Sequence, residues 1–317
     1  MARPQPRVVA IGDAIVDLVT PPMPPVPATD FQGEVSRFDR IPGGNATNFA
    51  LQMASLGART TFIGCVGADR EAAFLRHAYR RGRVRAILRV DRRRPTGATV
   101  ALTWSDGRRA LITSLGANAG LRSRDVPPSA IRGADHVHRS GFWWTEGLIG
   151  RPSAALLARA RRAGATTSLD VSTDPRGWAK KRIESVRLCL PYVDMFFGNE
   201  TEVCAVAGVS SPSEAARHLC SLGAREVVLH QAEHGSTAVT LERVVSASAV
   251  PVPIDNPTGC GDVFNAAYVH AKLRGASIPD ALQLGNACAA AHLANRDRPY
   301  PTLARVRRLL RSTSTTP

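Results

Sequence analysis

The sequence predicts an α/β fold in which helices cover both faces of a mostly parallel central sheet. From residue 8 onward, short apolar runs typical of buried strands alternate with longer stretches of helical periodicity. One hairpin signal interrupts this alternation near residue 105, where an Asp-Gly turn separates two strand-like runs. The 317 residues are enough for a sizeable core, and we expect a single domain over residues 1–317.

The predicted strands of the central sheet lie at residues 8–11, 60–63, 134–138, 167–169, 195–197 and 226–229. Helices are expected between them, at residues 46–56, 70–81, 152–163, 213–222, 263–272 and 278–294. The hairpin and two further candidate strands predict a small second sheet from about residues 14–20, 34–41 and 96–115. Because ligands of parallel sheets bind beyond the carboxyl ends of the strands, functional residues are expected there.

The formal net charge of +15 raises the question of a nucleic-acid partner. The basic residues are spread along the chain and are not interleaved with aromatic residues. Their densest cluster, between Arg76 and Arg94, is interrupted by apolar residues and is interpreted as a solvated helix face and loop. An alternative is a patch that attracts anionic substrates or assists subunit contact. We expect no nucleic-acid partner.

Neither a membrane span nor a secretory signal is expected, because no apolar run reaches about 18 residues and the N-terminus leads directly into a strand. A cytoplasmic location follows as an expectation. The six cysteines include no Cys-x-x-Cys pair, so we interpret them as reduced thiols of the core. Cys260 differs from the others because it lies inside a glycine motif, where a helix N-terminus could lower its pKa.

The most informative segment is Asp255-Asn-Pro-Thr-Gly-Cys-Gly-Asp262, which precedes an apolar helical stretch. Glycines let backbone N–H groups approach an anion, and a helix N-terminus adds partial positive charge at the same place. Gly259, Cys260 and Gly261 therefore predict an anion hole, with the Asp262 carboxylate beside it. This pairing suits a base that takes a hydroxyl proton while a phosphoryl group is stabilised. The plainer alternative is a loop followed by an N-capping aspartate.

Three further motifs accompany this segment. An apolar run from Val8 ends in acidic residues, a Gly43-Gly44 turn leads into an apolar helix, and Asn199 and Glu202 follow a buried strand. In this order and at these separations, from about residue 8 to about residue 295, the chain resembles the PfkB-type, or ribokinase-like, carbohydrate kinases. The resemblance implies a three-layer α/β/α fold, with the small second sheet as a lid over the acceptor. A lid shields the phosphoryl donor from water.

The resemblance also implies roles for individual residues. Asp262 would be the general base, and Gly259, Cys260 and Gly261 would stabilise the transferring phosphoryl group. The acceptor-binding residues would be Asp17, Gly43, Gly44, Asn45 and Asn48, and the nucleotide-binding residues Asn199, Gly235 and Asn286. Glu202 would organise Mg²⁺, acting through water, and Asp255 lies where some relatives hold a monovalent cation such as K⁺. Asp17, Asp255 and Asn286 could instead be capping or packing residues.

The chain departs from the family pattern before the nucleotide loop. His230 stands where Lys or Thr is common, and Ala232 stands where the first glycine of a Gly-x-x-Gly turn is expected, while Gly235 is retained. The preferred phosphoryl donor is therefore left open, although ATP with Mg²⁺ is expected.

Substrate expectations follow from a shorter motif. Leu115-Gly-Ala-Asn-Ala resembles a stretch of ribokinases and some fructokinases and favours a free sugar such as ribose or fructose. A nucleoside kinase is the alternative, with Trp104, Phe142, Trp143 and Trp144 as a candidate shelf for the base. A kinase of phosphorylated sugars is a third possibility, because arginine binds phosphate in bidentate fashion. A catalytically silent sugar or nucleotide sensor is the alternative outside enzymes. Lids of this family often pair, so a homodimer is expected.

Overall fold

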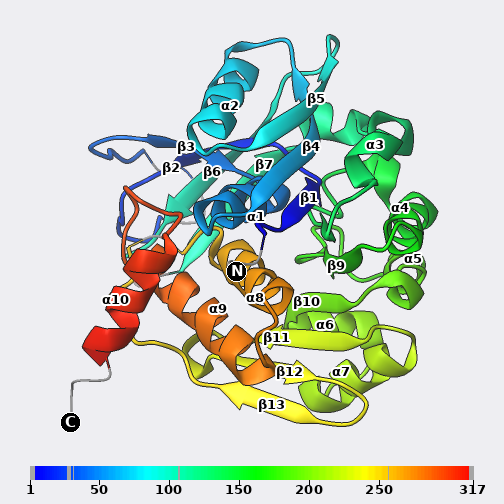
Figure 1. The fold of residues 1–317 in the computed structure, drawn as a ribbon. Helices are drawn as coiled ribbons and strands as arrows, with labels where there is room; N and C mark the ends of the chain where they lie inside the picture. The colour runs from blue at the N-terminus through cyan, green and yellow to red at the C-terminus, as the bar shows by residue number, and fades with distance from the viewer. Residues whose placement is uncertain (1–3, 27–29, 31, 106–107, 256, 314–317) are drawn as a thin grey trace.

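The computed structural model describes residues 4–313 apart from 27–29, 31, 106–107 and 256 (Figure 1). Two sheets and the helices around them form the molecule. The larger sheet has the strand order β13-β12-β11-β10-β9-β8-β1-β4-β5 and is parallel from β11 to β5. Its strands are β1 (Arg7–Ile11), β4 (Arg59–Gly67), β5 (Arg85–Asp91), β8 (His136–Arg139), β9 (Thr166–Asp170), β10 (Met195–Asn199), β11 (Glu226–His230), β12 (Ser236–Val239) and β13 (Val244–Ala247).

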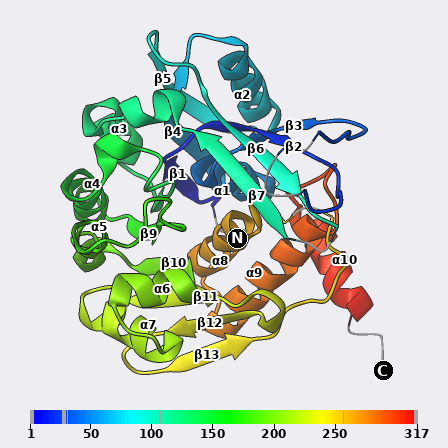
Figure 2. The same ribbon diagram turned by 180° about the vertical axis from the view of Figure 1, so that it is seen from behind.

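Helices cover both faces of this sheet, as the alternating pattern predicts. The α-helices are α1 (Asn45–Ser55), α2 (Arg70–Arg81), α3 (Pro128–Ile131), α4 (Arg151–Arg162), α5 (Lys180–Arg187), α6 (Glu200–Ala207), α7 (Pro212–Ser221), α8 (Cys260–Leu273), α9 (Ile278–Leu293) and α10 (Leu303–Thr313). Apolar residues of α1, α2, α8 and α9 pack on one face, and those of α4, α5, α6 and α7 pack on the other (Figures 1 and 2).

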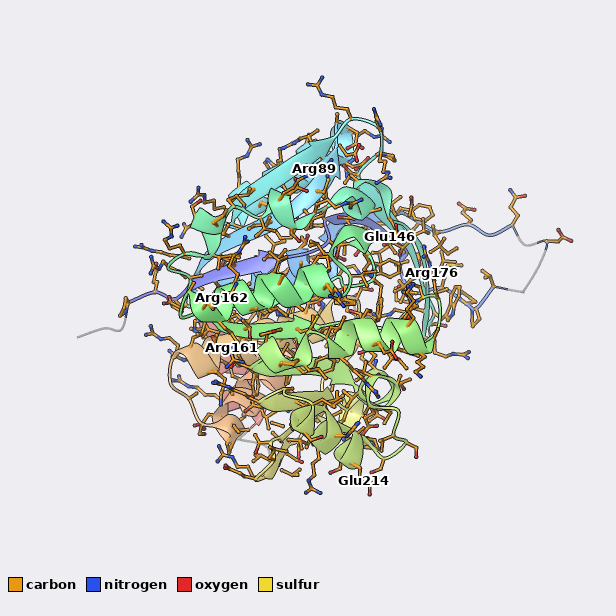
Figure 3. All side chains as sticks on the ribbon, turned by 90° about the vertical axis from the view of Figure 1, so that its right-hand side faces the viewer. Arg89, Glu146, Arg161, Arg162, Arg176 and Glu214 are labelled. Carbon is orange, nitrogen blue, oxygen red and sulfur yellow. The ribbon has the colours of Figure 1, made fainter. Side chains whose placement is uncertain are left out.

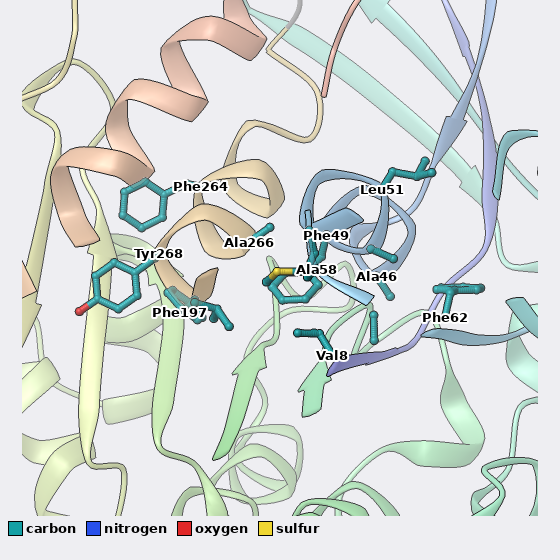
Figure 4. Packing of buried hydrophobic residues seen from close by; sticks show 14 of the residues in the cluster. Val8, Ala46, Phe49, Leu51, Ala58, Phe62, Phe197, Phe264, Ala266 and Tyr268 are labelled. Atoms are coloured by element: carbon teal, nitrogen blue, oxygen red, sulfur yellow. The ribbon is translucent and has the colours of Figure 1, made fainter. Parts of the chain in front are cut away.

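Strand β1 shows how the sequence places the core on both faces. Successive side chains of a strand point to opposite sides. Val8 accordingly joins the cluster beneath α1 and α8, whereas Val9 joins the cluster beneath α4. On the first face, Phe49 of α1 and Phe264 and Tyr268 of α8 pack over the sheet (Figure 4). This packing fixes α1 and α8 against each other.

The structure contains the small second sheet that the sequence predicts. This sheet has the order β3-β2-β6-β7, with β2 (Ile15–Val19), β3 (Asp39–Gly43), β6 (Gly97–Thr103) and β7 (Arg109–Ser114). Strands β6 and β7 form the expected antiparallel hairpin, and β2 pairs parallel to β6. The strand expected at 34–41 begins later, at Asp39, because residues 39–43 are the ones that pair with β2. The centre of the predicted turn, residues 106–107, lies outside the described residues.

Part of the arginine-rich segment is a strand, which corrects the expectation of a helix face and loop. Residues 85–91 form β5, an edge strand that pairs parallel to β4. Arginine suits an edge strand because a charged side chain discourages pairing with another chain. Figure 3 shows labelled basic residues on separate elements, with Arg89 on β5 and Arg161 and Arg162 on α4. In the part of the chain described, no helix has the length and hydropathy needed to cross a membrane.

Candidate functional site

The predicted anion hole lies at the N-terminus of α8. Gly259 is the N-cap and has φ +85°, and Cys260, Gly261 and Asp262 form the first turn. The N–H groups of a first turn lack partners within the helix, so they can bind an anion. A Cβ atom on Gly259 would lie 2.7 Å from Asn48 Nδ2. Only glycine therefore satisfies both the positive φ and the close approach of α1.

Two asparagines of α1 hold the Asp262 carboxylate. Asn45 Nδ2 donates to Oδ1 and Asn48 Nδ2 donates to Oδ2, each at 3.1 Å. The two residues are three positions apart, so they share one helix face. Asp262 is only 4% exposed, and burial, followed by the charge of Asp170, raises its pKa well above the usual range. A buried carboxylate that is fixed in orientation and has a raised pKa suits a general base.

Asp13, to which the sequence alone assigned no role, positions α1. It follows β1, is fully buried, and accepts from the backbone N–H groups of Asn45 and Ala46 at 3.1 and 3.0 Å. This carboxylate therefore caps α1 from another element. The signal in the sequence was its place two residues after the first strand. Asp13 thus fixes the helix end that carries Asn45 and Asn48.

Asp17 lies in β2, in the second sheet, where its carboxylate faces Gly43 of β3. A Cβ atom on Gly43 would come within 2.1 Å of Asp17 Oδ2, so the glycine makes room for the acid. Burial first, and the charge of Asp13 second, raise the pKa of Asp17 to about 7. A buried carboxylate at this place can accept hydrogen bonds from hydroxyl groups of a ligand.

A chain of polar residues connects α8 to β11 and β9. Asn265 Nδ2 donates to Asp170 Oδ2 at 2.6 Å, and His230 Nε2 lies 2.9 Å from Asn265 Oδ1. Burial lowers the pKa of His230 and raises that of Asp170 to about 6. A neutral imidazole that donates through Nε2 fits both observations. Asp170 and Asn265 had no predicted role, although Asn265 lies one helical turn after Asp262.

Asn199 and Glu202 form a reciprocal cap at the start of α6. Asn199 Oδ1 accepts from the Glu202 N–H and Glu202 Oε2 accepts from the Asn199 N–H, both at 2.9 Å. Thr173 Oγ1 donates to Glu202 Oε1 at 2.8 Å. Burial, followed by the charge of Asp170, raises the pKa of Glu202. The negative charge of the buried Glu202 carboxylate fits a cation held through water. Among the described residues, no three metal-ligating side chains form a cluster that could hold the ion directly.

Gly235 lies in the turn between β11 and β12, and Asn286 of α9 contacts the residue that follows it, Ser236. Asn286 Nδ2 donates to the carbonyl groups of Ala247 and Ser248, each at 3.0 Å, and its Oδ1 accepts from Ser236. Through these hydrogen bonds, Asn286 connects α9 to the edge of the sheet formed by β12 and β13. Ala232, at the place of the expected first glycine, has φ +48°, so the turn keeps the glycine-like backbone without the glycine.

Arg109 of β7 is a further residue that the sequence motifs missed. Its Nη1 lies 3.4 Å from Thr258 Oγ1, next to the anion hole. The charges of Asp262 and Asp17 both act on it. It therefore brings a positive charge from the second sheet to the N-terminus of α8. The sequence could not single out Arg109, because the chain has many arginines and nothing in the hairpin sequence distinguishes it from Arg108.

Several expectations need correction. Phe142 and Trp143 are buried in the core, so they cannot form a shelf for a nucleoside base. The expectation for the cysteines needs no correction: all six are free, and burial raises the pKa of Cys260 to about 12, so this thiol is not activated. Both Asp255 side-chain oxygens already face Arg296, at 3.4 Å from its Nε and 2.8 Å from its backbone N, so Asp255 does not fit a site for K⁺.

Comparison with known proteins gives a family match over most of the chain. The pattern of the pfkB family carbohydrate kinases matches residues 5–298. The aminoimidazole riboside kinase of Salmonella typhimurium is 26% identical, over 90% of this chain and 88% of the relative. The fructokinase of Klebsiella pneumoniae is 28% identical, over 87% of each chain.

A solved structure supports the fold. It is described as a ribokinase II from E. coli in complex with ATP and Mg²⁺, and it is similar with a TM-score of 0.83 at 20% identity. The similarity covers 97% of this chain and 99% of that one. Together with the family match over nearly the whole sequence, these findings show that the chain belongs to the pfkB family of carbohydrate kinases.

Proposed function

We propose that this kinase transfers the γ-phosphoryl group of ATP directly to a hydroxyl group of a small sugar such as ribose or fructose. The observation that carries the proposal is the place of Asp262. Its carboxylate sits in the first turn of α8, beside the anion hole, and two amides of α1 fix its orientation. A base and an anion-binding site at one helix end are the two groups that such a transfer needs.

In the proposed reaction, Asp262 accepts the proton of the acceptor hydroxyl group. The oxygen of that hydroxyl group forms the new bond to the γ-phosphorus. The bond between the γ-phosphorus and the bridging oxygen breaks, and ADP leaves. The N–H groups of the first turn of α8 and the Arg109 guanidinium would stabilise the charge on the transferring group. Asp17 would bind acceptor hydroxyl groups. Glu202, with Asn199, would hold Mg²⁺ through water, and the ion would neutralise phosphate charge.

A nucleoside acceptor remains the second candidate, because one relative is named for its action on aminoimidazole riboside. Phe142 and Trp143 do not support it. A panel assay distinguishes the candidates: release of ADP from MgATP is measured with ribose, fructose, 2-keto-3-deoxygluconate, adenosine, cytidine and fructose 6-phosphate. We expect one strong acceptor among the free sugars. Strong turnover of adenosine or cytidine would instead favour the nucleoside kinase.

The role of Asp262 is tested by Asp262→Asn. We expect kcat to fall by roughly 10²–10⁴-fold, the usual contribution of a general base, while the sugar still binds. Acceptor binding is measured by calorimetry, so that loss of chemistry is separated from loss of binding. Wild-type turnover in this variant would refute the mechanism. A protein that binds sugar but shows no turnover with any acceptor, in wild type as in the variant, would support the sensor alternative.

A further inference from the structure

A buried arginine joins the second sheet to the segment that leads into the anion hole. Arg296 follows α9 and is 7% exposed. Its Nη1 donates to the carbonyl oxygen of Thr20 at 3.0 Å and lies 3.2 Å from Asp39 Oδ2. Its Nη2 donates to the carbonyl oxygen of Asp255 at 2.9 Å. Its Nε lies 3.4 Å from Asp255 Oδ1.

These partners come from separate parts of the fold. Thr20 directly follows β2, and Asp39 is the first residue of β3, so both belong to the base of the second sheet. Asp255 begins the segment that ends at Gly259, the N-cap of α8. The Asp255 N–H also donates to the carbonyl oxygen of Leu293 at the end of α9. The guanidinium therefore connects the second sheet to Asp255, and the Asp255 N–H connects the same residue to the end of α9.

Oxygen atoms surround this guanidinium as they would surround a metal cation. Two backbone carbonyl groups and two carboxylates are oxygen ligands of the kind that hard cations bind. Arginine carries a permanent charge and presents its donors in a fixed fork. A buried charge needs paired partners, and the two carboxylates supply them.

We propose that Arg296 is a built-in cation that positions the second sheet over the N-terminus of α8 and makes the enzyme independent of K⁺. This inference rests on the proposed function, since it concerns how the lid and the anion hole are held together during transfer. Arg296 is a positioning residue, because its contacts are with Thr20, Asp39 and Asp255, and none is with Asp262.

The first test uses the wild-type protein. ADP release is measured in KCl, NaCl and choline chloride at one ionic strength, and the thermal midpoint is measured in the same three salts. We expect equal kcat and equal midpoints in all three. Specific activation or specific stabilisation by K⁺ would overturn the proposal. Because the midpoint does not depend on turnover, it tests the inference even if the panel of acceptors shows no kinase activity.

The second test compares Arg296→Gln with Arg298→Gln, which removes an exposed arginine two residues later. Displacement of a catalytic arrangement by about 1 Å can cost roughly 10²-fold in rate. We expect a loss of this size in kcat/KM for Arg296→Gln and none for Arg298→Gln. Circular dichroism shows whether each variant is folded. Wild-type kcat/KM in folded Arg296→Gln would overturn the proposal.

A conservative variant separates positioning from simple support of the fold. Arg296→Lys retains the charge but has fewer donors and lacks the planar fork. If Arg296→Gln does not fold, Arg296→Lys carries the test, with an expected partial loss of kcat at a near-wild-type thermal midpoint. Wild-type kcat in Arg296→Lys would contradict the role assigned to the fixed fork.

Discussion

At the scale of single residues, Asp17 combines its proposed role in acceptor binding with a cost in stability. Its pKa of about 7 in the folded protein, against an ordinary value of 3.8, means that folding favours the protonated acid. Its contribution to stability is therefore largest below pH 3.8 and is lost as the pH rises through about 7. At the pH where a carboxylate can accept hydrogen bonds from a sugar, this side chain destabilises the fold.

The variant Asp17→Asn should therefore be more stable than wild type at pH 8, by up to about 2–4 kcal/mol. At pH 4 the two proteins should differ little. The KM for the acceptor should rise, because the charged oxygen is lost. Thermal unfolding at both pH values and steady-state kinetics measure these effects, with Asp30→Asn, an exposed acid, as the control. Equal gains in stability at both pH values would show that ionisation of the buried acid is not the cause.

At the scale of elements, the junction of α1 and α8 decides the geometry of the site. The two helices pack together, and Gly259 lets the asparagines of α1 approach the end of α8. Gly259→Ala would place a methyl group against the Asn48 amide and force an unfavourable φ.

We expect Gly259→Ala to lower kcat by about 10²–10³-fold, comparable with the loss of an oxyanion-hole donor. The matched control is Gly164→Ala, because Gly164 has φ +87° but no atom lies within 4 Å of its added Cβ. Both variants should lose stability from the backbone, whereas only Gly259→Ala should lose turnover. Unchanged kcat in Gly259→Ala would show that the close approach of α1 is not needed for catalysis.

The sequence predicts elements well where one segment contains the whole signal. The helix expected at 70–81 coincides with α2, whose N-cap Asp69 accepts from the Ala72 N–H. Strands β5, β12 and β13 had no such signal. Arginines interrupt the apolar residues of β5, and its strand form comes from pairing with β4. Antiparallel β12 and β13 are likewise completed by pairing with β11 and with each other.

At the scale of the whole molecule, sequence motifs predicted candidate residues for the site but not the contacts between them. Asp262 is 217 positions from Asn45, and only the folded chain brings them together. The roles of Asp13, Asn265 and Arg296 were missed for the same reason. Each acts on an element distant in sequence, and no local pattern marks the partner.

An exposed apolar pair on the second sheet is a candidate contact of the expected homodimer. Val100 and Ile112 are cross-strand partners, 36% and 69% exposed. Large exposed apolar patches mark contact surfaces, and this neighbouring pair would contribute to one. We expect wild type to be a dimer by light scattering and Ile112→Asp to be a monomer. Leu241→Asp, an equally exposed apolar residue beyond β12, is the control and should leave the dimer intact. A monomeric wild type would contradict this prediction.

The hydrogen bonds of the Asp262 carboxylate fix which atoms of its neighbours donate and which accept. A carboxylate can only accept, so Asn48 must turn its NH₂ group toward it and keep its carbonyl oxygen for the hydroxyl group of Tyr300, at 2.9 Å. In Asp262→Asn, one of the carboxylate oxygens becomes an NH₂ group, which would face the NH₂ group of Asn45 or Asn48. One of the two asparagines would then have to turn its amide. Asp262→Asn therefore changes the hydrogen bonds between α1 and α8 as well as the charge. Pairing Asp262→Asn with Asn45→Asp would restore the matching of donors while moving the negative charge onto the other helix.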